Sequence, residues 1–93
     1  MHTKSMEIEF DPEKAASDFR KHRVGFAHAE QALRGPLGVT IEDPSSEGEP
    51  RFVTLGADSP GRILVVVSTP RNDRIRIISA RKASQNETRN YHA

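Results

Sequence analysis

Arginine is the residue type that most suggests chemistry in this sequence, and it gathers in one short segment near the C-terminus. Arg74 and Arg76 are two apart, so a strand would place them on the same face, because side chains alternate with a period of two. Neighbouring guanidinium groups repel each other unless an anion lies between them, and arginine is well shaped to hold a phosphate in a bidentate way. Arg81 and Lys82 follow closely. The segment therefore predicts a basic, phosphate-binding surface.

The spacing of Arg76 and Arg81 sets a condition on this prediction. The two residues are five apart, so a regular strand would point them to opposite faces. They converge only if a β-bulge or the strand end intervenes near Ser79 and Ala80. Arg62, at the start of the neighbouring expected strand, would extend the same surface. The alternative is a solvated face of ion pairs. Carboxylates available for such pairs are those of Glu42, Glu49 and Asp58.

A second basic cluster, Lys21-His22-Arg23, combines cations with an imidazole. In a functional interpretation the cations contact phosphate and His22 transfers a proton, because histidine changes protonation near neutral pH. The alternative is a helix C-terminus, where the helix macrodipole favours cations. Glu87 and Tyr91 lie four apart, on one face of an expected helix. Tyr91 is there either a packing residue or a phenol that transfers a proton.

The composition excludes several other chemistries. No cysteine is present, so disulfides, thiolate catalysis and cysteine-ligated zinc are ruled out. His2, His28 and His92 have no ligand spacing with one another or with acidic residues, so we expect no metal site and no cofactor. The sequence has no Gly-rich phosphate loop, nucleophile elbow or paired-carboxylate motif.

Charge is distributed unevenly along the chain. Residues 1–50 contain six Lys and Arg against ten Asp and Glu, a net −4, whereas residues 51–93 contain eight against three, a net +5. Such asymmetry favours a basic face for an anionic partner, although opposite halves of a protein also pair with each other. The longest apolar run, 63–67, is too short to span a membrane, and the N-terminus has no apolar signal segment. We therefore expect no membrane association and a cytoplasmic protein.

The elements that would position these side chains are short helices and a small sheet. The length predicts a single domain, 1–93, in which residues 1–5 are a flexible N-terminal extension. Alternating residues 6–10 indicate an edge strand. Asp11-Pro12 then begins a helix that ends at His22, because aspartate caps free N–H groups and proline fits the first turn. Its inward residues would be Ala15, Ala16 and Phe19.

A second short helix is expected over 26–33, before Gly35-Pro36. Its inward residues would be Phe26, Ala29, Ala32 and Leu33. Runs separated by turn residues then predict an antiparallel meander. Its strands would cover 37–42, 51–55, 63–67 and 74–80, with an exposed loop at 43–50 and a turn at 70–73. Ser84 and Glu87 match a capping box, which predicts a helix over 85–91. Segregated helices and strands indicate an α+β fold.

Several stretches of the chain closely resemble the BrnT toxins, in family order and spacing, from about Met6 to Tyr91. The most specific is Arg76-Ile77-Ile78-Ser79-Ala80-Arg81, followed by Lys82-Ala83-Ser84 and Glu87. The other matching stretches are Phe10–Ala16, Arg20–His22, Arg51–Gly56 and Gly61–Val67.

This resemblance implies a RelE-like fold, an antiparallel sheet with two N-terminal helices packed on one face and a short C-terminal helix. It implies the toxin of a type II toxin–antitoxin module, a metal-independent endoribonuclease that cleaves RNA and inhibits translation. The partner would be a BrnA-type ribbon-helix-helix antitoxin, in a two-plus-two complex that binds operator DNA through the antitoxin.

The resemblance also suggests roles for individual residues. Arg76 and Arg81 would stabilise the phosphate, and His22 or Tyr91 would transfer protons. The RNA-binding residues would be Lys21, Arg62, Arg74, Lys82 and Glu87. The sequence departs from the family pattern at Phe10, Gly25 and Arg23, the last of which stands where glycine is common. Gln85 and Asn86 replace arginines and remove positive charge. This thinning motivates an alternative, a catalytically weak module that binds RNA or only the antitoxin.

Overall fold

The computed structural model of the chain describes residues 7–44 and 47–92. Their elements are β1 (Glu7–Glu9), α1 (Pro12–His22), α2 (Phe26–Arg34), β2 (Val39–Glu42), β3 (Phe52–Ala57), β4 (Ile63–Arg71), β5 (Arg74–Lys82) and α3 (Gln85–His92). The predicted α+β fold class is confirmed. The predicted N-terminal extension, residues 1–5, lies outside the described residues. None of the described helices is long and apolar enough to cross a membrane.

The five strands form one sheet in the order β1-β5-β4-β3-β2. Strands β2 to β5 are antiparallel neighbours, which confirms the predicted meander. Strand β1 instead pairs in parallel with β5, so Glu7 lies beside Arg74 and Glu9 beside Arg76. The sheet is therefore mixed and not wholly antiparallel as expected. No hairpin joins β1 to β5, so chain connectivity does not impose an antiparallel pairing on them.

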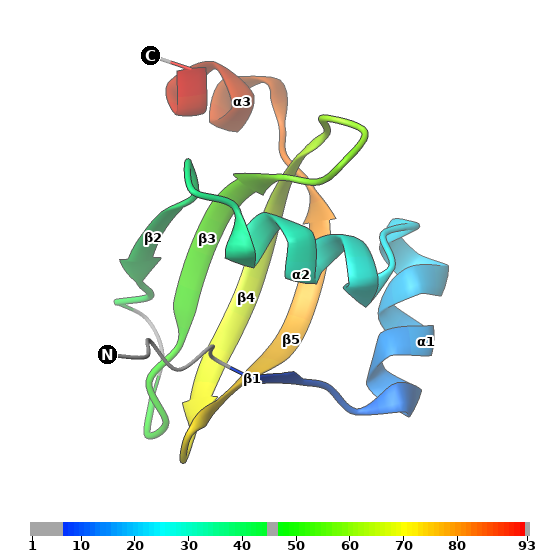
Figure 1. Cartoon of the computed structure of the whole chain (residues 1–93), viewed down its shortest axis with the longest axis vertical. Coiled ribbons are helices and arrows are strands. Elements are labelled where there is room, and N and C mark those ends of the chain that lie inside the picture. The colour runs from blue at the N-terminus through cyan, green and yellow to red at the C-terminus, as the bar shows by residue number, and fades with distance from the viewer. Residues whose placement is uncertain (1–6, 45–46, 93) are drawn as a thin grey trace, which may run out of the picture.

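Helix α1 begins at the predicted cap, where the Asp11 side chain accepts a hydrogen bond from the backbone N–H of Glu13 at 3.0 Å. Its buried face is smaller than predicted. Ala15 packs against the core, but Ala16 and Phe19 are exposed. The reason is that α1 lies along the β5 edge of the sheet and not across a face (Figure 1).

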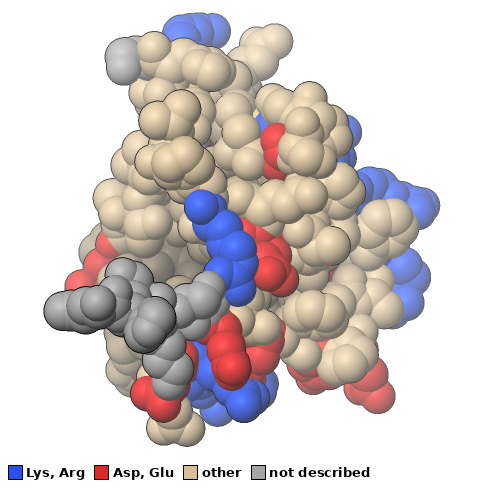
Figure 2. All heavy atoms as spheres, in the orientation of Figure 1, with Lys and Arg blue, Asp and Glu red and all other residues tan. Residues whose placement is uncertain are grey.

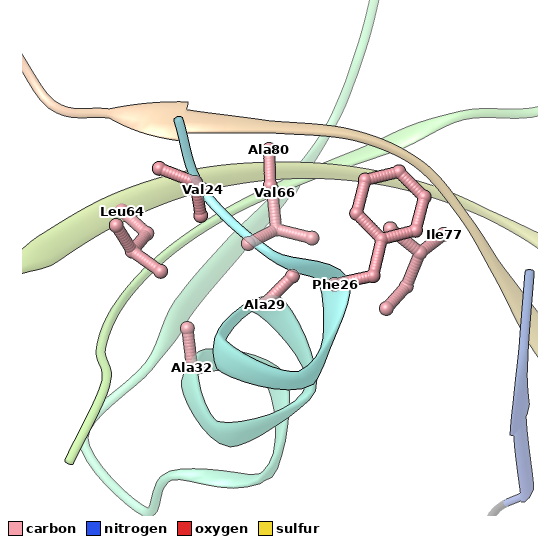
Figure 3. Close-up of a cluster of buried hydrophobic side chains, with 8 residues drawn as sticks. All are labelled: Val24, Phe26, Ala29, Ala32, Leu64, Val66, Ile77 and Ala80. Carbon is pink, nitrogen blue, oxygen red and sulfur yellow. The ribbon is translucent and has the colours of Figure 1, made fainter. Parts of the chain in front are cut away.

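Helix α2 crosses one face of the sheet, referred to below as the inner face (Figure 1). Figure 3 shows its apolar side chains pointing at those of β4 and β5. The alanines permit a close approach, and a Cβ added to Gly56 of β3 would lie 2.4 Å from the carbonyl oxygen of Ala32. The buried cluster consists of Val24, Phe26, Ala29, Ala32, Leu64, Val66, Ile77 and Ala80.

The hairpin between β4 and β5 is tighter than predicted. Only Asn72 and Asp73 form the turn, so Pro70 and Arg71 belong to β4 and not to the turn expected over 70–73. Asn72 adopts a left-handed φ of 56°, which asparagine tolerates better than most residues. A two-residue turn therefore suffices, and β4 extends to Arg71, while β5 begins at Arg74 as predicted.

Helix α3 lies beyond the end of the sheet (Figure 1). The predicted capping box forms, because the Ser84 hydroxyl accepts a hydrogen bond from the Glu87 N–H at 3.1 Å and the Glu87 carboxylate accepts one from the Ser84 N–H at 2.8 Å. The start of α3 is thus fixed by the two residues that predicted it.

Candidate functional site

A β-bulge in β5 interrupts the regular alternation of its side chains. Val67 of β4 pairs with Ser79, whereas the next residue of β4 pairs with Ile77. Ile78 is therefore the extra residue, and one inserted residue reverses the face to which every later side chain points. The bulge lies next to the position that the sequence argument required.

This bulge places Arg76 and Arg81 on the same face of the sheet. Ile77 and Ala80 are both buried against α2, so Arg76 and Arg81 beside them point to the opposite face, referred to as the outer face. Their partners in β4 are four residues apart, which puts the two arginine Cα atoms about 13 Å from each other. The arginines share a face and occupy different ends of it.

Helix α1 and β5 form a furrow beside the bulge, referred to as the α1–β5 furrow. Lys21 and His22 line one hollow of the furrow, with Ile78 on the strand side. A second hollow shares Lys14 and Ile78 with the first and is lined by Arg76. Lys21 and His22 therefore line one hollow of the furrow and Arg76 lines the adjoining one, with Lys14 and Ile78 between them.

Asp18 holds α1 in this position. Its carboxylate accepts a hydrogen bond from the backbone N–H of Ala80 at 3.1 Å, on a stretch of β5 that β1 does not reach. The contact satisfies an N–H group at the sheet edge. Because Lys21 and His22 lie one turn further along α1, the same contact positions them at the furrow.

The arginines near the start of β5 are bound to glutamates of β1. Arg76 donates hydrogen bonds from Nε and Nη2 to Glu9 at 3.0 and 2.7 Å, and Arg74 Nε lies 3.0 Å from a carboxylate oxygen of Glu7. The hydrogen bonds from Arg76 hold the pKa of Glu9 below its ordinary value. The solvated-face alternative predicted that the arginines form ion pairs, and Arg74 and Arg76 do so. Their carboxylate partners come from β1 and not from the residues expected from the sequence.

Arg81 is bound to α3 in the same manner. Its Nη1 and Nη2 donate to the two carboxylate oxygens of Glu87 at 2.8 and 2.9 Å. Together with the Ser84 N–H, these bonds lower the pKa of Glu87 to about 2, and Glu87 raises the pKa of Arg81. Glu87 thus binds Arg81 and caps α3 at the same time. The Tyr91 ring packs edge-on against the His92 ring, with the two ring centroids 5.2 Å apart.

Arg62 lies away from the furrow, contrary to the expectation that it extends the same surface. It donates from Nε to Asp58 at 2.8 Å, and Nδ1 of His28 lies 3.2 Å from the same buried carboxylate. Burial raises the pKa of Asp58, but hydrogen bonds from Arg62 outweigh it and lower that pKa overall. His28 belongs to α2, so this cluster lies on the side of the inner face. Lys82 also falls on the inner side, two residues after Ala80.

Sequence reasoning missed three cations that line the same hollow as Arg76, namely Lys14, Arg51 and Arg71. The available signal for Lys14 was its position seven residues before Lys21, which puts both on one face of α1. Arg51 and Arg71 gave no such signal, because the register of the sheet strands determines whether they lie near Arg76. In the described part of the chain, no group of three or more His, Cys, Asp or Glu is placed to hold a metal ion.

The inner side of the molecule carries little charge. Figure 2 views this side and shows mostly uncharged atoms over α2 and the sheet. Lys and Arg gather over α1 at the right-hand edge and at the lower end of the sheet, where Asp and Glu are interleaved with them. That lower end is where β1 meets β5, and the pattern agrees with the pairs of Arg74 and Arg76.

Comparisons with known proteins identify the family of this chain and a solved structure with a similar fold. A family model described as "Ribonuclease toxin, BrnT, of type II toxin-antitoxin system" matches residues 10–87. The crystal structure of the Brucella abortus ribonuclease toxin BrnT resembles this chain with a TM-score of 0.64 at 27% identity, over 87% of this chain and 100% of that one. No curated protein matches. Because the family model spans most of the chain, from the residue before the Asp11 cap to Glu87, the chain belongs to the BrnT family of ribonuclease toxins of type II toxin–antitoxin systems.

Proposed function

We propose that this chain is a metal-independent endoribonuclease that cuts RNA at the α1–β5 furrow and thereby inhibits translation. A base removes the proton of a ribose 2′-hydroxyl, and the 2′-oxygen attacks the adjacent phosphorus. The bond from phosphorus to the 5′-oxygen breaks, and an acid protonates that oxygen. The products are a 2′,3′-cyclic phosphate and a 5′-hydroxyl. In this proposal side chains alone supply the base, the acid and the cations that the reaction needs.

The observation that supports this proposal best is that His22 and Arg76 line adjoining hollows between α1 and β5. In the proposal His22 transfers a proton at the furrow. Tyr91 lies on α3 and lines neither hollow of the furrow, so it serves as the second proton-transfer group only if the RNA brings α3 and the furrow together. Arg76 and Arg81 stabilise the crowded phosphate, and Lys21 binds its neighbour along the RNA. Arg62, Arg74 and Lys82 contact RNA that extends past the furrow, and Glu87 positions Arg81.

The glutamate partner of Arg76 does not block this role. The pair with Glu9 uses Nε and Nη2, and a guanidinium has five N–H donors. The two N–H groups of Nη1 are not used by Glu9, so a phosphate can bind Arg76 while the pair persists. The carboxylate also holds the guanidinium in a fixed orientation, which reduces the reorganisation needed when charge develops on the phosphate.

The proposed partner is a BrnA-type antitoxin with a ribbon-helix-helix DNA-binding end. Membership of a type II toxin–antitoxin family supports a protein antitoxin in general. We propose two toxins and two antitoxins in a complex that acts in the cytoplasm and binds operator DNA through the antitoxin.

One set of observations favours a second function, binding without cleavage. Arg74, Arg76 and Arg81 each carry a glutamate partner, and α3 begins with the uncharged Gln85 and Asn86. A chain with this reduced positive charge would bind RNA in a salt-sensitive way without cutting it, or would bind only the antitoxin.

The deciding experiment incubates the purified chain, free of antitoxin, with RNA in the presence of EDTA. The nuclease proposal expects shorter RNA that ends in a 2′,3′-cyclic phosphate. Salt-sensitive RNA binding without any cyclic phosphate would replace it with the binding function. Cleavage that EDTA abolishes would contradict the metal independence alone.

A further inference from the structure

The outer face of the sheet carries an apolar patch that no described helix covers. Helix α2 lies on the inner face, α1 along the β5 edge and α3 beyond the end of the sheet (Figure 1). Cross-strand pairing aligns β2, β3 and β4 so that apolar residues form two adjacent rows on the outer face. Val39 and Ile41 are 55% and 60% exposed. The outer apolar patch consists of the exposed Val39 and Ile41, the partly exposed Val53, Leu55 and Val67, and Val65 between them, which is only 4% exposed.

Cations lie next to this patch on the side of β5. The row that begins at Val39 ends at Arg81, which pairs with Val65. Further along the same face, the hollow around Arg76 is lined by four cations and only two carboxylates. These are Lys14, Arg51, Arg71 and Arg76, with Asp11 and Glu49. Arg71 pairs with Glu49, Arg76 with Glu9 and Arg81 with Glu87, whereas no ion pair within the described residues involves Lys14 or Arg51. The outer face therefore combines exposed aliphatic surface with two cations that no described carboxylate pairs.

We propose that an acidic, apolar segment of the antitoxin covers the outer apolar patch. Its apolar side chains pack on Val39 and Ile41, and its carboxylates face the cations beside β5. This inference rests on the proposed function and assigns the surface at which the partner docks. Strand β2 is three strands away from β5 in the sheet, so inhibition requires the segment to continue across β3 and β4 to β5, where it covers the α1–β5 furrow.

The chemistry of the patch favours this occupant over two others. RNA bases stack on aromatic rings or guanidinium planes, whereas the patch is wholly aliphatic. A second copy of the chain, laid face to face, would bring a second Lys14 and Arg51 to the interface and no unpaired glutamate from the ion pairs of β5, and like charges across an interface are unfavourable. An acidic protein segment buries the aliphatic side chains and pairs with the cations at the same time.

The test measures the affinity of the purified toxin for the antitoxin encoded beside its gene. The double variant Val39→Asp, Ile41→Asp should bind about 30-fold more weakly or worse, because two apolar contacts are replaced by buried charges that face incoming carboxylates. Both residues are exposed in the free toxin, so the variant should keep its circular dichroism spectrum and melting temperature. Ala27→Asp adds the same charge at an exposed position of α2 on the other side of the sheet and should change the affinity less than twofold.

Unchanged affinity of the double variant would overturn the inference. So would a wild-type toxin that self-associates in sedimentation velocity through this patch, if the double variant is monomeric and still binds antitoxin normally. Wild-type toxin that does not bind the antitoxin at all would overturn the proposed partner and the docking surface together. RNA cleavage by free toxin is read separately, so its absence would contradict the nuclease function while the affinity data still decide the docking surface.

Discussion

Arg81 and Glu87 form a two-bond ion pair that joins β5 to α3. The nitrogen–oxygen distances are 2.8 and 2.9 Å, and the same carboxylate accepts the Ser84 N–H. Two charged N–H groups aligned with two carboxylate oxygens make a strong and directional contact. One glutamate therefore begins α3 and also ties it to the strand that carries the other site arginines.

This pair predicts an unusual titration of Glu87. Its pKa of about 2 in the folded chain lies below the value of about 4.3 for an unfolded glutamate. The ionised carboxylate therefore stabilises the fold above about pH 4, and this contribution is lost as the pH falls through 2. We expect the NMR signal of the Glu87 carboxyl carbon to titrate near pH 2, and α3 amides to stay protected from hydrogen exchange at pH 4.

Substitution of the partner provides the control. Arg81→Gln removes the charged donors, so the pKa of Glu87 should rise toward that of an ordinary glutamate and α3 should exchange faster. Arg89→Gln removes an exposed charge from α3 itself and should leave the titration unchanged. A wild-type midpoint near pH 4 would show that the pair does not form in solution.

Gly56 is predicted to tolerate no side chain. A Cβ there would sit 2.4 Å from the Ala32 carbonyl oxygen, so Gly56→Ala must push α2 away from β3. We expect a loss of about 1–3 kcal/mol in the free energy of unfolding, measured by urea denaturation. Gly25→Ala is the matched control, because the nearest atom is 3.9 Å away. Equal effects of the two substitutions would disprove the close approach of α2.

Arg23 is predicted to be a suboptimal end for α1. It has a left-handed φ of 62°, and its N–H donates to the Phe19 carbonyl oxygen, a geometry that glycine adopts without strain. Arg23→Gly should therefore raise the free energy of unfolding by about 0.5 kcal/mol, despite loss of the guanidinium contact over the Phe19 ring at 5.8 Å. Arg23→Ala keeps the strain and loses the contact, so it should lower stability. A lower melting temperature for Arg23→Gly would contradict this account.

Local features of the fold were predictable from the sequence because short-range chemistry determines them. Asp11 caps α1 and Ser84 pairs with Glu87 at the start of α3, as the residue types required. The inward residues of α2 followed from helical spacing, and Phe26, Ala29 and Ala32 are buried. Phe19 was placed wrongly, because periodicity identifies an apolar face but not whether a helix lies over a sheet or beside its edge.

The candidate site depended on contacts between distant residues, which periodicity does not determine. A bulge was identified as necessary for Arg76 and Arg81 to share a face, but no residue near Ser79 signals one. The carboxylate partner of Arg76 is Glu9, 67 residues away, because β1 inserts in parallel beside β5. The acids of β1 alternate with the same period as the arginines of β5. This match is recognised as complementary only once the two strands are known to pair. Asp58 was among the carboxylates expected to pair with the arginines, and it binds Arg62, from which only three residues separate it.

Arg76 is predicted to contribute to catalysis more than to binding. In the proposed reaction the phosphate gains charge in the transition state, so a guanidinium already oriented by Glu9 should stabilise that state more than the bound substrate. Arg76→Gln should therefore lower kcat for RNA cleavage by a factor of about 100 to 1000, with a smaller change in KM.

Arg34→Gln is the matched control, because Arg34 pairs with Glu30 on α2 at 2.9 Å, away from the furrow. It should keep kcat within about threefold of wild type. Melting temperatures separate lost catalysis from lost folding. A loss confined to KM would reduce Arg76 to an RNA-binding residue, and equal kcat in both variants would remove the furrow from the mechanism.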